Sequence, residues 1–344
     1  DDTTYKLLNV SGNDAIGVGD GTVAPTTDIA GASRVRGAAN EYADPGAFTT
    51  DLITATRTIG KDGWQDFTTF TNAEAEADTI ANELLGGSRL NLAERNGKIV
   101  YEAYAATYQE TTTVSFQNNI TTGPGNAITY QAASGSKHLG VSGQGVYIVR
   151  PANSSNVNFL IYSDYSTFDG LSIYNEQNNT RPITLQGVRN GVTIQNCLVH
   201  ADFSNGVCVQ TSTKSAGNIA PNVFENNVLR WQGNYGLYLA QVQGSETVPG
   251  KAIVNNNTFQ PAAAGGVGLG FADTGSYFDV SANNNLLLSG LSMYTVGSVR
   301  ITGQGNFDVQ TAAQGAYVPL PENIRGAAAP ITVVTETSAI STGN

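Results

Sequence analysis

The sequence predicts an all-β protein that folds as a right-handed parallel β-helix, a solenoid with a short N-terminal capping helix and extended terminal arms. Two observations favour this fold: an asparagine-rich motif that returns about every 30 residues, and apolar tripeptides with the same spacing. The composition agrees with both. Only 13% of the 344 residues are charged and 39 are Gly, whereas long helical proteins are rich in Glu, Lys, Ala and Leu.

The asparagine motif aligns in three columns, within which the residues are 26, 30, 30 and 28 positions apart. The first column holds Phe168, Ile194, Phe224, Val254 and Ala282, the second Leu171, Cys197, Asn227, Asn257 and Asn285, and the third Ile173, Val199, Leu229, Phe259 and Leu287. Equivalent residues of successive β-helix coils stack on one another, so the first and third columns predict internal apolar stacks.

The second column predicts a ladder of side-chain hydrogen bonds inside the solenoid. An asparagine at the bend between two strands can turn inward and bond to the asparagines above and below it. This satisfies amides whose unpaired burial would cost about 1 to 3 kcal/mol each. We therefore expect a structural ladder of Asn227, Asn257 and Asn285, with Cys197 taking the same place in the preceding coil.

A second series of residues supports the same repeat. The tripeptides Val207–Val209, Leu237–Leu239 and Val267–Leu269 each follow a glycine and lie 30 residues apart. Their outer residues are apolar and their middle residue varies, which is typical of a strand with one buried face.

The coil pattern, over residues 56–309, resembles the right-handed parallel β-helix of the pectate-lyase-like superfamily. Three segments resemble the opening of β-helix proteins found among bacteriophage virion components: TRTIGKDGWQDFTTFTNAEAEADTIANELL, GKIVYEAYAATYQETTTVSFQNN and NAITYQAASGSKHLG. This resemblance implies the fold and a place in a virion. Because homotrimers are common among viral β-helices, it also implies a homotrimer.

The chain divides into three parts. Residues 1–55 are rich in Gly, Ala, Thr and Asp and predict an extended arm for attachment or assembly. Residues 56–310 form the β-helix, with a capping helix near 72–85 that Thr71-x-x-Glu74 would begin. Residues 311–344 form a C-terminal tail, in which Ile331 to Thr335 is a possible intersubunit strand.

Charge and hydropathy argue against two classes of partner. The net charge of −11 and the absence of a basic run argue against nucleic acid. No apolar run approaches the roughly 20 residues of a membrane span. The two cysteines, Cys197 and Cys208, have patterns that suggest opposite sides of the wall, so a disulfide between them is the less favoured reading.

Acidic residues provide weak candidates for catalysis. Asp169, Asp202 and Glu225 are the catalytic candidates, and a pair such as Asp169 with Asp202 could assemble from different coils, as glycoside hydrolysis requires. We expect neither a metal site nor a cofactor, because no column combines several carboxylates with a neighbouring Arg or Lys. The carboxylates in question are those of Asp164, Asp169, Glu225, Asp273 and Asp279.

Histidines and aromatic residues complete the set of candidates. His138 and His200 are expected as turn or surface residues rather than catalytic bases. Trp231, Tyr235 and Tyr238 are weak candidates for ligand binding, since all three are expected to face outward on one coil. Aromatic faces stack on sugar rings and are also common in protein interfaces.

The sequence favours a non-enzymatic structural protein of a phage-like particle, a β-helical spike, fibre or capsid decoration. Its N-terminal arm would bind other virion proteins, and its surface would contact host-surface polysaccharide. The first alternative is a polysaccharide depolymerase or lyase of the pectate-lyase-like superfamily. The second is a secreted or cell-surface adhesin that binds glycans without cleaving them.

Overall fold

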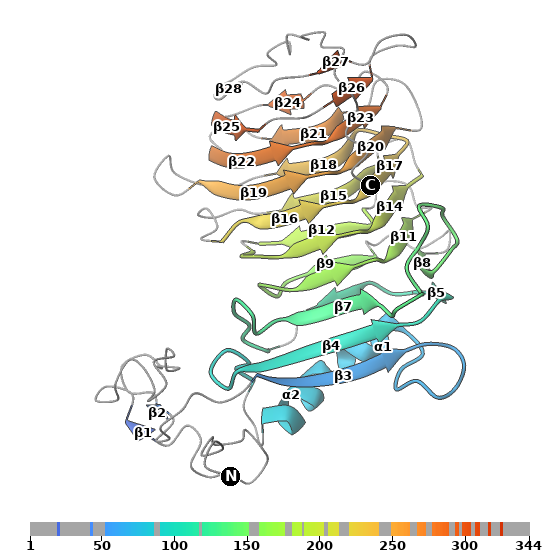
Figure 1. Cartoon of the computed structure of the whole chain (residues 1–344), viewed down its shortest axis with the longest axis vertical. Coiled ribbons are helices and arrows are strands. Elements are labelled where there is room, and N and C mark those ends of the chain that lie inside the picture. Colours follow the sequence, from blue (N-terminus) through green and yellow to red (C-terminus); the bar gives the residue numbers. More distant parts are fainter. Residues whose placement is uncertain are drawn as a thin grey trace, which may run out of the picture.

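The computed structural model describes residues 19–20, 42–43, 52–85, 90–116, 119–150, 158–175, 181–187, 189–202, 206–212, 220–240, 249–261, 267–272, 277–288, 293–295, 298–303, 307–309, 316–317 and 324–325. Within these ranges the chain winds as a solenoid whose wall consists of three sheets (Figure 1). Strands from successive coils lie side by side in each sheet, and the pairing is parallel from β3 to β26.

The ten-stranded sheet contains, in spatial order, β28 (Ile324–Arg325), β25 (Ser298–Thr302), β22 (Tyr277–Asn283), β19 (Gly250–Asn255), β16 (Asn222–Glu225), β13 (Thr193–Gln195), β10 (Thr167–Asp169), β7 (Ile128–Ala132), β4 (Gly97–Ala103) and β3 (Ile53–Ile59). The nine-stranded sheet contains β27 (Ala316–Tyr317), β26 (Phe307–Val309), β23 (Leu286–Leu288), β20 (Thr258–Pro261), β17 (Val228–Trp231), β14 (Leu198–Ala201), β11 (Ser172–Asn175), β8 (Val146–Arg150) and β5 (Ala106–Gln109).

The seven-stranded sheet contains β24 (Met293–Thr295), β21 (Val267–Ala272), β18 (Tyr235–Ala240), β15 (Val207–Ser212), β12 (Ile183–Gln186), β9 (Phe159–Ile161) and β6 (Val114–Phe116). Apart from β3 beside β4 and β26 beside β27, the neighbour of each strand in these three sheets is the third strand along the chain, as in β10, β13 and β16. This order is that of a parallel β-helix, so the predicted fold class is confirmed.

The predicted apolar columns have the register that the sequence indicates. Phe168 pairs with Ile194, Ile194 with Phe224, and Phe224 with Val254 across the ten-stranded sheet. In the nine-stranded sheet Ile173, Val199, Leu229, Phe259 and Leu287 are paired in the same way. The first column from Phe168 to Ala282 and the third column from Ile173 to Phe259 are buried.

The second series has a different register from the one predicted. Val209, not Val207, pairs with Leu237, and Leu237 pairs with Leu269. The predicted constant step of 30 residues was therefore wrong, because the first step is two residues shorter and the second is two residues longer. Because side chains alternate between the faces of a strand, a shift of two keeps Val209, Leu237 and Leu269 in the core.

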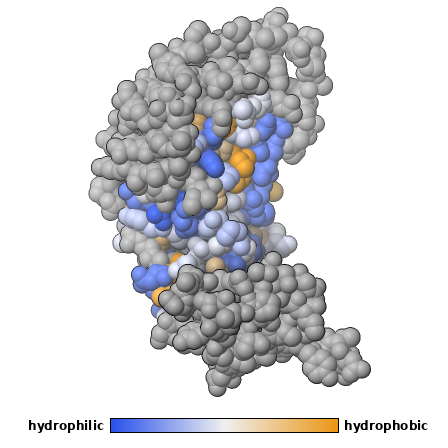
Figure 2. Space-filling model, turned by 90° about the vertical axis from the view of Figure 1, so that its left-hand side faces the viewer, coloured by the Kyte–Doolittle hydropathy of each residue, from blue (hydrophilic) through white to orange (hydrophobic). Residues whose placement is uncertain are grey.

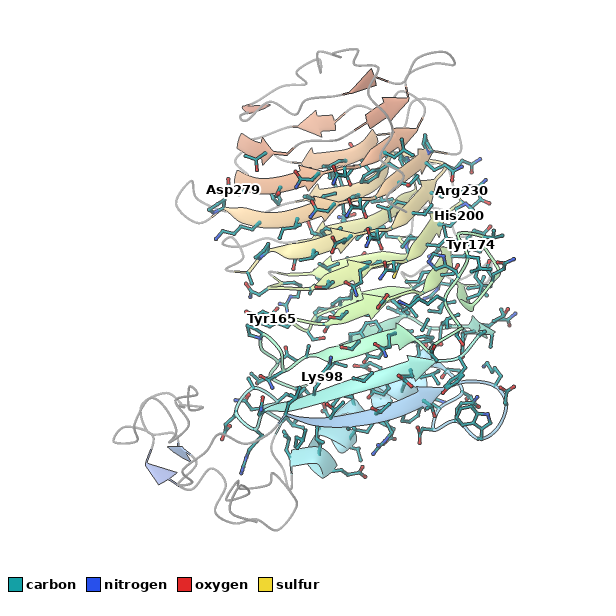
Figure 3. The ribbon with its side chains drawn as sticks, in the orientation of Figure 1. Lys98, Tyr165, Tyr174, His200, Arg230 and Asp279 are labelled. Carbon is teal, nitrogen blue, oxygen red and sulfur yellow. The ribbon has the colours of Figure 1, made fainter. Side chains whose placement is uncertain are left out.

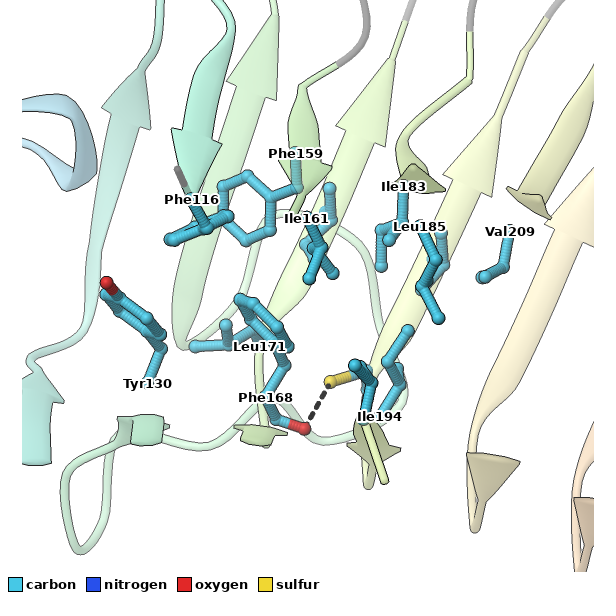
Figure 4. Packing of buried hydrophobic residues seen from close by; sticks show 14 of the residues in the cluster. Phe116, Tyr130, Phe159, Ile161, Phe168, Leu171, Ile183, Leu185, Ile194 and Val209 are labelled. Atoms are coloured by element: carbon cyan, nitrogen blue, oxygen red, sulfur yellow. Dashed lines mark hydrogen bonds between the residues drawn. The ribbon is translucent and has the colours of Figure 1, made fainter. Parts of the chain in front are cut away.

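Aromatic rings fill the early coils. The rings of Tyr101, Tyr130 and Phe168 stack along the solenoid, with centroids 4.8 and 5.5 Å apart and planes within 9° of parallel. Phe116 and Phe159 meet each other edge-on at 5.0 Å beside this stack. Figure 4 shows this cluster continuing into the smaller aliphatic side chains of the following coils.

Two helices cover the first coils, α1 (Phe70–Ala75) and α2 (Ala77–Leu85). The N-cap of α1 is Thr69, whose side-chain oxygen accepts a hydrogen bond from the backbone N–H of Asn72, so the helix begins earlier than the predicted Thr71 start. Thr71 instead donates from Oγ1 to Glu110 at 2.7 Å. No helix in the described ranges is long and apolar enough to cross a membrane.

The terminal arms fall mostly outside the described residues. In the N-terminal region β1 (Gly19–Asp20) pairs antiparallel with β2 (Tyr42–Ala43). Near the C-terminus β27 and β28 pair antiparallel with β26 and β25 of the same chain. The segment Ile331 to Thr335, predicted as an intersubunit strand, lies outside the described residues.

Bends of two residues connect the ten-stranded sheet to the nine-stranded sheet. The first residue of the bend has a positive φ, and in four successive coils it is Asn196, Asn226, Asn256 or Asn284, with φ between 52° and 56°. Asparagine adopts this left-handed conformation more readily than other residues with a side chain. One coil earlier the position is occupied by Gly170, with φ 73°.

The second residue of each later bend points inward. Asn227 Nδ2 donates to Asn257 Oδ1 at 3.0 Å, and Asn257 Nδ2 donates to Asn285 Oδ1 at 3.1 Å. The backbone N–H of Cys197 donates to Asn227 Oδ1 at 2.9 Å, which continues the series into the preceding coil. All four residues are buried.

Both cysteines lie inside the solenoid, which corrects the expectation that they lie on opposite sides of the wall. Cys197 and Cys208 are fully buried and are not joined by a disulfide. Burial raises the pKa of the Cys197 thiol to about 12 and raises that of Cys208 further. Each thiol donates to backbone carbonyls instead, Cys197 to Gln195 and Cys208 to Arg230.

Candidate functional site

A polar column lies on the outer face of the ten-stranded sheet, beside the bends. It consists of the outward residue that follows the first apolar column in each coil. Register places these residues side by side in the order Glu102, Gln131, Asp169, Gln195, Glu225, Asn255 and Asn283. Carboxylates and amides alternate over the first five positions, and all seven side chains are half-buried.

This column overturns the expectation that the acidic residues share no column with a basic neighbour. Asp169 and Glu225 occupy equivalent positions two coils apart, and Lys137 reaches Asp169. Neighbouring strands lie about 4.8 Å apart, so strand positions two coils apart are separated by about 9.5 Å. Gln195 lies between the two carboxylates.

Two donors hold one oxygen of Asp169. Lys137 Nζ lies 3.1 Å from Oδ1, and Asn196 Nδ2 lies 2.8 Å from the same atom. Asp169 has 17% of its side chain exposed, whereas Lys137 has 49% exposed. The carboxylate is therefore fixed in orientation by a cation and an amide at Oδ1, and no described residue forms a hydrogen bond with its other oxygen, Oδ2.

Glu225 has different surroundings. No hydrogen bond or ion pair within the described ranges involves its carboxylate, although the side chain is half-buried. Among the described residues the two acidic groups of this pair therefore have different surroundings: a cation binds the carboxylate of Asp169, and none binds that of Glu225. Such a contrast between two carboxylates is what separates their roles in acid–base chemistry.

Short side chains separate the polar column from the far edge of the same face. Thr167, Thr193 and Val223 pair in register two residues before the polar column. At the far edge Figure 3 places Lys98, Tyr165 and Asp279 on the side where the strands begin. Seen from that side, the described surface is mainly hydrophilic, with a few hydrophobic residues (Figure 2).

Asp202 is not part of this site, so the predicted pair of Asp169 with Asp202 is not brought together. Asp202 lies beyond the far end of β14 in the nine-stranded sheet, where Tyr174 donates from its hydroxyl to Asp202 Oδ2 at 3.1 Å. The ring of His200 packs against Tyr174 with centroids 4.7 Å apart (Figure 3). Burial and the neighbouring Arg230 lower the pKa of His200 to about 4, so this histidine is neutral at pH 7.

The aromatic candidates are divided between the interior and the surface. Trp231 is fully buried, so the expectation that it faces outward was wrong. It is the last residue of β17, where Leu229 points inward and Arg230 outward, and alternation returns Trp231 to the core. Tyr235 and Tyr238 are half-buried and stack on each other with centroids 4.4 Å apart.

A separate cavity of about 590 Å³ lies at the capped end of the solenoid, between β3 and the helices. It is lined in part by Arg57 and Glu83, which form an ion pair at 3.1 Å. None of the predicted site residues lines it. Across the described part of the chain, no group of three or more His, Cys, Asp or Glu side chains gathers as metal ligands would.

Comparisons with known proteins find no matching family model and no similar curated protein. Among solved structures, the chain is similar to the pectin methylesterase from Aspergillus niger, with 12% identity, a TM-score of 0.40, and coverage of 78% of this chain and 94% of that one. It is also similar to Escherichia coli ybhc, with 12% identity, a TM-score of 0.41, and coverage of 72% and 76%. At this level of similarity neither protein's activity transfers to this chain, and the parallel β-helix rests on its own strand pairing.

Proposed function

We propose that this chain cleaves a polysaccharide on the outer face of the ten-stranded sheet, with Asp169 and Glu225 as the reacting carboxylates. The observation that carries the proposal is the register that places these two residues in one column, two coils apart. This was the alternative reading of the sequence, and the polar column favours it over a scaffold without chemistry.

The spacing of the carboxylates favours hydrolysis with inversion. Inverting glycosidases keep their two carboxyl groups about 6.5 to 9.5 Å apart so that a water molecule fits, whereas retaining enzymes hold them about 5 to 5.5 Å apart. Two coils separate the strand positions of Asp169 and Glu225 by about 9.5 Å. The wider arrangement therefore fits this column better.

The surroundings of each carboxylate assign its role. Asp169, oriented by Lys137 and Asn196, acts as the base that takes a proton from water while the water oxygen bonds to the anomeric carbon. Glu225, whose carboxylate is bound by no cation among the described residues, protonates the glycosidic oxygen as its bond to that carbon breaks. Gln195, between them, offers an amide to the hydroxyl groups of the sugar.

The test is digestion of a panel of neutral and acidic polysaccharides, with release of reducing ends as the signal. We expect Asp169→Asn and Glu225→Gln to lower kcat at least about 100-fold each, the effect typical of losing a general acid or base. Asp202→Asn is the matched control, since Asp202 lies on another sheet, and it should retain full activity. Unsaturated sugar products would show that the chain acts as a lyase and not as a hydrolase. Unchanged activity in both site variants would refute the assignment of Asp169 and Glu225.

The virion role stays a prediction and is compatible with this activity, since a spike can both attach to a particle and cleave a glycan. Its N-terminal arm, residues 1–55, lies largely outside the described residues. The predicted homotrimer is tested by native mass measurement of the purified chain. A purely monomeric chain at high concentration would contradict it.

A further inference from the structure

The loop of residues 133–145 is an exception to the two-residue bends. It connects β7 to β8 at the same corner where Gly170 and Leu171, or Asn196 and Cys197, suffice in the following coils. Its tip is solvent-exposed, with 83% of Leu139 and 53% of Val141 accessible. The tip therefore gains little from apolar burial, and polar contacts to other coils hold the loop in place.

Two consecutive side chains make those contacts. Lys137 reaches the next coil and binds Asp169, and His138 reaches one coil further, where its Nε2 lies 2.7 Å from the carbonyl oxygen of Asn196. His138 Nδ1 accepts a hydrogen bond from the backbone N–H of Gly140 at 3.1 Å. Because Nδ1 is an acceptor, the ring proton is on Nε2, which donates to Asn196.

The coil beneath the loop is shaped to admit Lys137. A Cβ atom at Gly170 would lie 2.9 Å from Cγ of Lys137 and 3.1 Å from its Cδ. The later bends have asparagine where this coil has Gly170. Glycine at this one bend therefore leaves room for the lysine stem to cross toward Asp169.

We propose that Lys137, carried by the 133–145 loop, is a positioning residue for Asp169. The hydrogen bonds of His138 to Asn196 and Gly140 hold this loop in place, and we call them the latch. This inference rests on the proposed function, and it adds the way in which the site is assembled. Lys137 and Asn196 both bind Oδ1, which fixes the carboxylate and leaves Oδ2, without a hydrogen bond from any described residue, as the oxygen that would take the proton from water.

The latch depends on the protonation state of His138. Protonation of the ring would place a proton on Nδ1, which then could not accept the hydrogen bond from the Gly140 N–H. The two N–H groups would face each other as donors, so this hydrogen bond would be lost. Among the described residues, the charged groups near His138 are Lys137 on its own loop, and Asp169 of β10, which Lys137 binds. Burial lowers the pKa of His138 below its usual value; the hydrogen bond to the Asn196 carbonyl opposes this shift in part, and the charge of Lys137 adds to it.

The sign of the pH dependence follows from that direction. A histidine whose pKa is lowered on folding contributes stability that is fully present above its ordinary pKa of about 6.5 and is lost as the pH falls through the folded value. The contribution of His138 to stability is therefore complete at neutral pH and decreases in acid.

The positioning role is tested with two substitutions on the full chain. Lys137→Met keeps the stem and removes the charge; we expect kcat to fall about 10- to 100-fold with KM nearly unchanged, because a hydrogen bond to a charged group is lost. Lys137→Arg should restore most of the activity. A methionine variant with wild-type kcat, a rise in KM alone, or an inactive arginine variant would each overturn the role.

The latch is tested without any substrate, by hydrogen–deuterium exchange of peptides that contain residues 138–146. We expect faster exchange in His138→Phe than in the wild type near neutral pH, and, after correction for intrinsic rates, loss of wild-type protection as the pH is lowered below the ordinary histidine pKa of about 6.5. Equal protection in both proteins would eliminate the latch. If no polysaccharide is cleaved but this difference appears, the proposed function fails while the latch stands.

Discussion

The same corner of the solenoid is built in two ways. In the later coils asparagine takes both bend positions, so that Asn226 and Asn227 are followed by Asn256 and Asn257, and the inward side chains form a ladder. In the earlier coil the bend is Gly170 and Leu171, the interior is apolar, and a loop crosses the outside. The bend follows the asparagine pattern beside Glu225, and it departs from that pattern beside Asp169.

The largest expected effect is loss of the ladder at its middle. Asn257 accepts from the backbone N–H and the Nδ2 of Asn227, and it donates to Phe224 O and Asn285 Oδ1. Asn257→Ala leaves these buried groups unpaired, so we expect a loss of about 3 to 5 kcal/mol of unfolding free energy, measured by urea denaturation. Asn256→Gly, at the outward bend position, is the control and should change little. A loss below about 1 kcal/mol in Asn257→Ala would show that the ladder is not what holds the later coils.

A smaller effect is expected when the early bend is given the inward residue of the late bends. Leu171→Asn places an amide against Cys197, which has no side-chain carbonyl to accept from it. We expect a loss of about 2 to 3 kcal/mol, from unpaired burial and lost apolar contact. Urea denaturation measures it. A neutral result would mean that the ladder extends into the early coils without cost.

The smallest effect on stability is expected at the outward position of the early bend. Gly170→Asn keeps a residue that tolerates the left-handed conformation, but its Cβ displaces the Lys137 stem. We expect a change in unfolding free energy of no more than about 1 kcal/mol, together with a fall in kcat that matches Lys137→Met. Wild-type activity in this variant would show that the glycine is not needed to admit the lysine.

The apolar residues were enough to predict the stacking of the coils. Phe168, Ile194 and Phe224 pair in the register read from the sequence, because a one-residue slip would expose every buried side chain. Trp231 was misplaced although the same alternation indicates its burial. The constant step fails in the second series because the connection from the nine-stranded to the seven-stranded sheet is two residues shorter between β17 and β18 than between β14 and β15 or between β20 and β21.

The candidate site was only partly predictable. Asp169 and Glu225 each follow a first-column residue directly, so their common column was available from the sequence once the residues were read in register. Glu102 and Gln131 were not, since their coils lack the asparagine motif. Lys137 comes from a loop without a counterpart in the repeat, and no periodicity can indicate which coil such a side chain reaches.

The ladder also determines where this chain can change in length. An inserted or deleted residue at the bend between the ten-stranded and nine-stranded sheets would rotate Asn227 or Asn257 out of line with its neighbours and break several hydrogen bonds at once. Additions at the other corners leave that line intact. In the coils that carry the ladder, insertions that bring new specificity should therefore accumulate at those other corners during evolution, whereas the 133–145 loop occupies the bend corner of a coil that lies outside the ladder.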